Sequence, residues 1–292
     1  MLMTEEVRHI NVAVADRRRF ATSAMALWLR VVMLALGSLS GTLPAFAQAP
    51  AATVELETRP NVKVRMLVIR PTNPVAAVIL LAGGDGVIDL SANGAIRRDG
   101  NFLVRSRGLF AERGLAVAVM DAPSDQIGER GLLGFRQTPE HVRDLGAAVA
   151  YMRKEFNLPV WLVGTSRGTT SAAMGAIGLG DKGPFGIVLT SSMLSSGGGE
   201  LPTLALDQIR VPTLVVHHEQ DECQHCKFAD VPKLMNGLKN APSKELITFK
   251  GGMRQKGKQW QPCEAFSYHG YYGIETGVVD AVSKWVSAKS KS

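Results

Sequence analysis

The residues best suited to chemistry lie in a glycine-flanked run around Ser166. Gly164-Thr165-Ser166-Arg167-Gly168 has the form G-x-S-x-G, and it follows an apolar run, Pro159–Val163, and precedes a helix-compatible stretch. A serine on so sharp a strand-to-helix turn is lifted clear of a sheet, and the flanking glycines let strand and helix approach without a Cβ clash. The pattern predicts that Ser166 is a nucleophile.

A serine hydroxyl needs a general base, and the base needs a group that orients it. We predict His269 as the base, because it follows the last apolar strand on a loop before the final helix. We predict Asp221 as the acid, because it lies just beyond an apolar run that ends at Val216. The chain order Ser, Asp, His suits this architecture. Glu219, nearer the strand end, is the alternative acid.

Three further histidines, His217, His218 and His225, share the loop of the predicted acid. They are poorer bases because they crowd that loop. We interpret His217 or His218 as a structural residue that supports it.

A tetrahedral oxyanion needs two backbone N–H donors. Arg167, the residue after the nucleophile, supplies the first. The turn Ala82-Gly83-Gly84-Asp85-Gly86 follows another apolar run and supplies the second. We predict Gly84, with Gly83 and Asp85 as alternatives. A phosphate-binding role for this turn is not favoured, because it lacks Gly-Lys-Ser/Thr and does not match G-x-G-x-x-G.

The cysteines lie close in sequence to the predicted acid and base. If Asp221 and His269 are in hydrogen-bond contact, their loops are neighbours, and a bridge between the loops is geometrically reasonable. We therefore predict the disulfide Cys223–Cys263, with Cys226 left reduced and Cys226–Cys263 as the alternative pairing. A loop of about 40 residues closed in this way contributes roughly 3–4 kcal/mol in chain-entropy models.

Zinc is the competing interpretation of the same cysteines. Cys223-x-x-Cys226, with His225 and Cys263, offers a donor set that zinc accepts. An exported chain meets an oxidising environment, which favours a disulfide. We therefore expect no metal and no other cofactor.

The elements that must position these residues are short apolar runs alternating with helix-length amphipathic segments. Strands are predicted at Val62–Ile69, Val75–Leu81, Leu115–Met120, Pro159–Val163, Phe185–Leu189, Thr213–Val216 and Leu246–Phe249. Helices are predicted at Pro139–Phe156 with Thr138 as N-cap, at Val231–Leu238 and at Val278–Val286. This alternation predicts a mostly parallel sheet with helices on both faces and a site at the carboxyl ends of its strands.

With these motifs in place, the chain resembles the α/β-hydrolase superfamily from roughly Thr53 to Val286. It looks most like the small bacterial dienelactone-hydrolase and esterase groups. The resemblance implies the α/β-hydrolase fold and hydrolysis of an ester. It departs from dienelactone hydrolases, which carry cysteine where this chain has Ser166, and from lipases with H-G-G-G, because Ala82 opens the glycine-rich turn.

Lid size follows from the spacing of the strands. Only Ser191–Arg210 separates two strands at the place where hydrolases of this type often insert a lid. We expect a minimal lid, with the Ala122–Gln137 loop overhanging an open pocket that suits small or extended esters.

The N-terminus differs in composition from the rest. Arg17-Arg18-Arg19 precedes the apolar stretch Phe20–Leu43, which ends in small residues at A-x-A spacing. This order predicts a signal peptide over residues 1–47, cleaved after Ala47 or two residues later, and hence a periplasmic or secreted protein. A membrane anchor is the alternative. The arginines resemble a twin-arginine signal, whereas translation from Met25 leaves an ordinary one.

The remaining chain, residues 48–292, contains no Pro- or Ser-rich linker and is predicted to be a single domain. The net charge of +7 falls to +5 without residues 1–47, which hold five arginines and three acids. No basic stripe with interleaved aromatics is present, so nucleic-acid binding is not expected. The predicted partner is a small-molecule ester, with no stable membrane span after processing. A serine peptidase, an acyltransferase or a non-catalytic binding domain is the alternative function.

Overall fold

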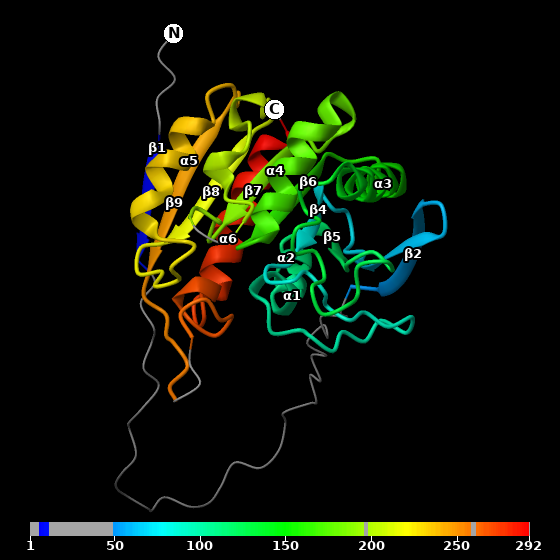
Figure 1. The fold of residues 1–292 in the computed structure, drawn as a ribbon, viewed down its shortest axis with the longest axis horizontal. Helices are drawn as coiled ribbons and strands as arrows, with labels where there is room; N and C mark the ends of the chain where they lie inside the picture. The colour runs from blue at the N-terminus through cyan, green and yellow to red at the C-terminus, as the bar shows by residue number, and fades with distance from the viewer. Residues whose placement is uncertain (1–5, 12–48, 196–197, 258–260, 292) are drawn as a thin grey trace, which may run out of the picture.

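The computed structural model describes residues 6–11, 49–195, 198–257 and 261–291. These residues form a nine-stranded sheet in the order β1-β9-β8-β7-β6-β4-β5-β3-β2 (Figure 1). The strands are β1 Glu6–Asn11, β2 Ala51–Arg59, β3 Val62–Ile69, β4 Ala76–Leu81, β5 Leu115–Met120, β6 Val160–Thr165, β7 Gly186–Thr190, β8 Thr213–His218 and β9 Lys244–Lys250. The helices are α1 Phe102–Arg105, α2 Arg107–Glu112, α3 Pro139–Phe156, α4 Gly168–Leu179, α5 Val231–Gly237 and α6 Glu275–Lys289.

The central strands are parallel, and their sequences explain why. Every residue of β4, β5, β6, β7 and β8 is buried. Continuous apolar runs of this kind suit parallel strands that are covered on both faces. Only β3 and β2, at one end of the sheet, run antiparallel to their neighbours. The sequence prediction of a mostly parallel sheet is therefore confirmed.

Strand β2 is absent from the sequence prediction. Glu55 and Glu57 interrupt its apolar residues, and only Val54 and Leu56 pack partly against the core. An edge strand that buries one face carries a weaker apolar signal than a central strand.

Helix α3 has the bounds that its sequence predicts. The Thr138 side chain accepts a hydrogen bond from the His141 backbone N–H, and Pro139 occupies the first turn. The helix ends at Asn157, which takes a left-handed conformation with φ 53°. Both ends are therefore set by local capping chemistry.

Helices cover the sheet on both faces (Figure 1). One core cluster joins the sheet to α3, α4 and α5 through residues such as Leu145, Ala172 and Leu234. The other joins the sheet to α1, α2 and α6 through residues such as Phe110 and Val282. Side chains on these strands alternate between the two clusters, so each helical layer has its own apolar interface.

The segment between β7 and β8 confirms the expected minimal lid. Its described residues, 191–195 and 198–212, contain only two single-turn 3-10 helices, Leu201–Thr203 and Leu206–Gln208. The loop after β5, which was expected to overhang the site, reaches the Gly-rich turn after β4, where the Leu132 N–H donates to the Asp85 carbonyl over 2.7 Å.

The predicted signal peptide lies largely outside the described residues, including its apolar stretch and the Ala47 cleavage position. Within it, Glu6–Asn11 forms β1, which pairs in parallel with β9 at the end of the sheet. Cleavage after residue 47 would remove β1 and leave β9 as the edge strand. In the part of the chain that the structure describes, no helix combines the length and the hydropathy that a membrane span requires.

Candidate active site

Ser166 sits on a tight turn between β6 and α4. Its φ of 52° lies in the left-handed region, which is strained for a residue with a side chain. A Cβ atom on Gly164 would lie 2.3 Å from the Gly168 carbonyl oxygen, and one on Gly168 would lie 2.1 Å from the Leu81 carbonyl oxygen. Neither flanking position can therefore carry a side chain, and Ser166 itself remains partly exposed.

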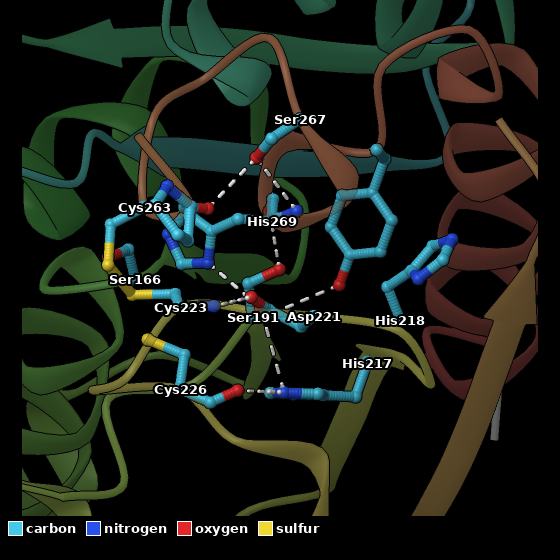
Figure 2. Close-up of polar contacts among 12 residues, drawn as sticks. Ser166, Ser191, His217, His218, Asp221, Cys223, Cys226, Cys263, Ser267 and His269 are labelled. Carbon is cyan, nitrogen blue, oxygen red and sulfur yellow. Dashed lines mark hydrogen bonds and ion pairs between the residues drawn. A yellow bond between two sulfur atoms is a disulfide. The ribbon is translucent and has the colours of Figure 1, made fainter. Parts of the chain in front are cut away.

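His269 and Asp221 are in direct contact beyond the carboxyl ends of β9 and β8. The distance from His269 Nδ1 to Asp221 Oδ2 is 2.9 Å, and both side chains are buried (Figure 2). Ionised Asp221 only accepts hydrogen bonds, so Nδ1 carries the proton and Nε2 keeps its lone pair. The carboxylate therefore fixes the tautomer that a general base requires.

The Asp221 carboxyl stays ionised although it is buried. Burial by itself raises its pKa, but the charge and hydrogen bond of His269 outweigh that effect and leave the pKa below its ordinary value. His217 and the backbone N–H of Cys223 act in the same direction. That N–H donates to Asp221 Oδ1 over 2.9 Å, so the other carboxylate oxygen is also held.

The backbone of His269 is fixed by two serines that sequence reasoning did not identify. The His269 N–H donates to Ser267 Oγ over 3.1 Å, and the Ser191 hydroxyl donates to the His269 carbonyl over 2.7 Å (Figure 2). Tyr271 completes this support, since its hydroxyl accepts from the Ser191 N–H and donates to the Val216 carbonyl. These serine and tyrosine contacts cross three loops, and no short motif reveals them.

The Ser166 hydroxyl lies close to the Cys226 thiol and lowers the thiol pKa, against the larger rise that burial causes. No hydrogen bond joins Ser166 to His269 among the described contacts. The Cys226 sulfur and a His269 ring nitrogen nevertheless lie within 4.8 Å of each other, so both groups border the serine. Catalytic hydrogen bonds are often long before a substrate binds, so the missing contact does not remove His269 as the candidate base.

Cys223 and Cys263 form a disulfide, which is the pairing predicted from the sequence, and Cys226 is a buried free thiol. The bridge joins the loop of Asp221 to the loop of His269. Burial raises the pKa of the Cys226 thiol, and the charge of Asp221 adds to that rise. Cys223, Cys226 and His269 are close enough to share a metal ion, but the disulfide occupies the sulfur of Cys223 and leaves Cys226 as the only thiol of this group.

The other acid-loop residues have structural partners. His217 Nε2 lies 2.7 Å from the Cys226 carbonyl, and His218 Nε2 lies 2.9 Å from the Gly251 carbonyl. Burial lowers the pKa of both imidazoles. Glu219, the alternative acid, accepts from Thr248 Oγ1 over 2.9 Å and pairs with Lys250 over 3.0 Å. In these contacts it faces β9 and not the base.

The glycine-rich turn Ala82–Gly86 lies against the serine. A Cβ atom on Gly83 would lie 2.9 Å from Ser166 Cβ, so the backbone of this turn touches the strand-to-helix turn directly. Gly84 has φ 58°. Among the described residues, no acceptor takes the N–H of Gly83, Gly84 or Asp85. Gly84 is exposed and Asp85 partly exposed, so a ligand can reach this part of the turn, whereas Gly83 is buried.

A cavity of about 360 Å³ opens beside this turn. It is lined by the 130–137 segment, Arg167, Thr170 and the 198–199 backbone, and its cationic residues are Arg130, Arg136 and Arg167. Ser166, Asp221 and His269 do not line it. The cavity therefore adjoins the serine through Arg167 but does not contain the three candidate catalytic residues.

No family model matches this chain, and no curated protein matches it by sequence. Its structure is similar to that of a dienelactone hydrolase from Anabaena variabilis, with a TM-score of 0.56 and 14% identity over 82% of this chain and 97% of that one. An esterase from Pyrococcus furiosus gives a TM-score of 0.57 at 14% identity, covering 83% and 92%.

Dipeptidyl peptidase 4 from Porphyromonas gingivalis gives a TM-score of 0.58 at 12% identity, over 82% of this chain and 35% of the larger peptidase. At 12 to 14% identity these similarities concern the fold alone. The chain has the α/β-hydrolase fold.

Proposed function

We propose that this protein is an exported serine hydrolase that cleaves a carboxylic ester through an acyl-enzyme on Ser166. The contact of 2.9 Å between His269 and Asp221 is the observation that carries the proposal, because it gives a base with a defined tautomer beside a serine on a strained turn. The three residues come from three different strand ends, which is where ligands of such sheets bind.

In the proposed acylation step, Ser166 Oγ attacks the ester carbonyl carbon while His269 Nε2 takes the hydroxyl proton. Asp221 stabilises the imidazolium that forms. The N–H groups of Gly84 and Arg167 hold the oxyanion, with Gly83 and Asp85 as alternative donors in the same turn. The tetrahedral intermediate then expels the alcohol, which takes the proton from His269.

Deacylation repeats these steps with water. His269 removes a proton from water, the hydroxide attacks the acyl carbon, and the carboxylic acid leaves as Ser166 recovers its proton. A serine peptidase or an acyltransferase would use the same groups with an amide substrate or with another acceptor in place of water. The similarity to a dipeptidyl peptidase keeps the peptidase as the second candidate.

Export is supported by the N-terminal pattern and by the disulfide. Disulfides persist in oxidising compartments, and this one joins the two loops that carry the acid and the base. The proposal predicts a mature N-terminus at residue 48 or 50 in protein recovered from the periplasm or the medium. A full-length chain retained in the cytoplasm would contradict export without affecting the hydrolase assignment.

A panel of 4-nitrophenyl esters of increasing acyl length, with matched aminoacyl anilides, tests the chemistry. Ester hydrolysis by the wild-type protein, and a loss of at least about 10³-fold in Ser166→Ala, are expected because a nucleophile has no substitute. The Ser166→Ala protein should keep its melting temperature, since a partly exposed turn serine contributes little packing. Comparable turnover by both proteins would refute the assignment, and faster anilide cleavage would favour the peptidase.

A further inference from the structure

A buried arginine, Arg136, lies behind the glycine-rich turn Ala82–Gly86 and has no role in the reaction steps proposed above. Arg136 Nη2 donates to the carbonyl of Ala82 over 3.1 Å and to the carbonyl of Gly84 over 3.3 Å. The Leu132 N–H donates to the Asp85 carbonyl from the same segment. Three carbonyls of the turn are therefore held by residues of the 132–136 segment.

These contacts determine where the amide groups of the turn point. In a trans peptide, the C=O of one residue and the N–H of the next point in opposite directions. When Arg136 holds the carbonyls of Ala82 and Gly84, it turns the N–H groups of Gly83 and Asp85 away from itself. The peptide between them carries the Gly84 N–H, and its carbonyl, that of Gly83, accepts from the Gly86 N–H over 3.0 Å. Arg136 therefore fixes the peptide planes on either side of the Gly84 donor.

The arginine is itself held by a second pair of residues. Arg136 Nη1 donates to Ser171 Oγ over 2.7 Å, and Ser171 Oγ lies 2.8 Å from His141 Nε2. Burial lowers the pKa of His141 to about 3, so its imidazole is neutral and can accept the Ser171 hydroxyl proton. The chain of donors therefore runs from Arg136 through Ser171 to His141.

The guanidinium of Arg136 stays charged although it is buried. Arg136 is 5% exposed, its hydrogen-bond partners are carbonyls and a hydroxyl, and its Nε has no hydrogen-bond partner in the described structure. Burial lowers its pKa to about 9, with the nearby Arg167 adding to the effect, so it remains a cation at neutral pH. The charge of Asp85 favours the cation, but no carboxylate pairs directly with Arg136 among the described residues. A buried charge without a direct ion pair weakens a fold, so a role at the site explains this arginine better than stability does.

We propose that Arg136 is a positioning residue that holds the Ala82–Gly86 turn in the shape needed to bind the oxyanion and places a positive charge behind it. The proposal rests on the hydrolase function proposed for Ser166. Fixed N–H groups and a nearby cation stabilise a charge that exists only after Ser166 has attacked, so they should act on the rate and not on substrate binding.

Arg136→Met and Arg136→Lys test this in the full-length protein, with kcat divided by the fraction of sites that a fluorophosphonate titrates. We expect Arg136→Met to lower kcat per titrated site about 10²-fold with little change in KM. Arg136→Lys should recover part of that loss, because it keeps the charge and one donor. Binding of phenylboronic acid, which forms an anionic tetrahedral adduct with a serine, should weaken in parallel with kcat.

Arg59→Met is the matched control. Arg59 is a largely buried arginine that pairs with Asp144 and Asp125 and makes no hydrogen bond to the turn in the described structure, although its charge lowers the pKa of His141. Its loss removes a nearby buried charge without removing a contact to the turn, so it should lower the melting temperature and the number of titrated sites but leave kcat per site nearly unchanged. If the Met variant does not fold, Arg136→Lys carries the test. Wild-type kcat per site in either folded Arg136 variant, or an equal loss in Arg59→Met, would overturn the proposal, whereas an inactive wild-type protein would refute the hydrolase function instead.

Discussion

The molecule contains two serine–histidine arrangements five residues apart along α4 and its preceding turn, and their surroundings differ in charge. His269 lies 2.9 Å from the carboxylate of Asp221 beside the partly exposed Ser166. His141 lies 2.8 Å from Ser171, which is fully buried and hydrogen-bonded to Arg136. The residue types are the same, but one imidazole faces an anion and the other faces a cation.

The difference shows that the charged group beside a histidine determines whether the imidazole can accept a proton and act as a base. Burial and the charges of Arg136 and Arg59 lower the pKa of His141 to about 3, so it cannot hold a proton taken from a hydroxyl at neutral pH. Asp221 stabilises the protonated form of His269. Hydrogen-bond distance alone would have suggested the buried pair as the reactive one.

Replacement of the two histidines should give the largest contrast. His269→Ala should lower kcat/KM for an ester by about 10³-fold or more, as Ser166→Ala does, because nucleophile and base act as a unit. His141→Gln should change it by less than about tenfold, since glutamine can still accept from Ser171. Kinetics on both purified variants would check this, and a His141 variant as inactive as the His269 variant would contradict the assignment.

The orienting acid gives the next contrast. Asp221→Asn should lower kcat by about 10² to 10⁴-fold, because the imidazolium loses its charge partner while the loop keeps its shape. Glu219→Gln, on the same loop but paired with Thr248 and Lys250, should cost less than tenfold. If Glu219→Gln proved the more damaging change in steady-state kinetics, Asp221 would be the wrong acid.

The sequence predicted the Ser166–His269–Asp221 arrangement better than the buried Ser171–His141 pair, for a physical reason. Ser166 and its glycines form a local pattern because one tight turn determines them all. Asp221 and His269 follow strand ends, which apolar periodicity locates. Arg136 binds carbonyls about 50 residues earlier in the chain, and any residue type supplies a carbonyl, so no pattern in the sequence marks its partners.

The disulfide should have a moderate effect on both stability and rate. Cys263→Ser removes the cross-link between two residues that are 40 positions apart, so the free energy of unfolding should fall by roughly 3–4 kcal/mol. Turnover should fall as well, because the bridge joins the loops of Asp221 and His269. Thermal unfolding and kinetics would measure both effects. Peptide mapping of the unreduced wild-type protein that finds Cys223 joined to Cys226 would contradict the pairing.

The smallest expected effect is the pH dependence of stability that comes from His141 in the buried Ser171–His141 pair. The pKa of His141 falls from 6.5 in the unfolded chain to about 3 in the folded one, so below pH 6.5 only the unfolded state binds this proton. Above pH 6.5 His141 has no effect on the free energy of unfolding. Below that value it lowers the free energy of unfolding by about 1.4 kcal/mol for each pH unit. Urea unfolding of His141→Gln should show a correspondingly flatter decline between pH 6.5 and 4.5. Parallel curves for the two proteins would contradict the pKa assignment.

One labelling experiment separates the two serines directly. Trypsin cuts after Arg167, so Ser166 falls in the peptide of residues 155–167 and Ser171 in the peptide of residues 168–182. Wild-type protein treated with a fluorophosphonate should carry the adduct on the first peptide alone. Ser171→Ala should be labelled in the same place, and Ser166→Ala should not be labelled. An adduct on residues 168–182, or ester hydrolysis without any adduct on residues 155–167, would contradict Ser166 as the nucleophile.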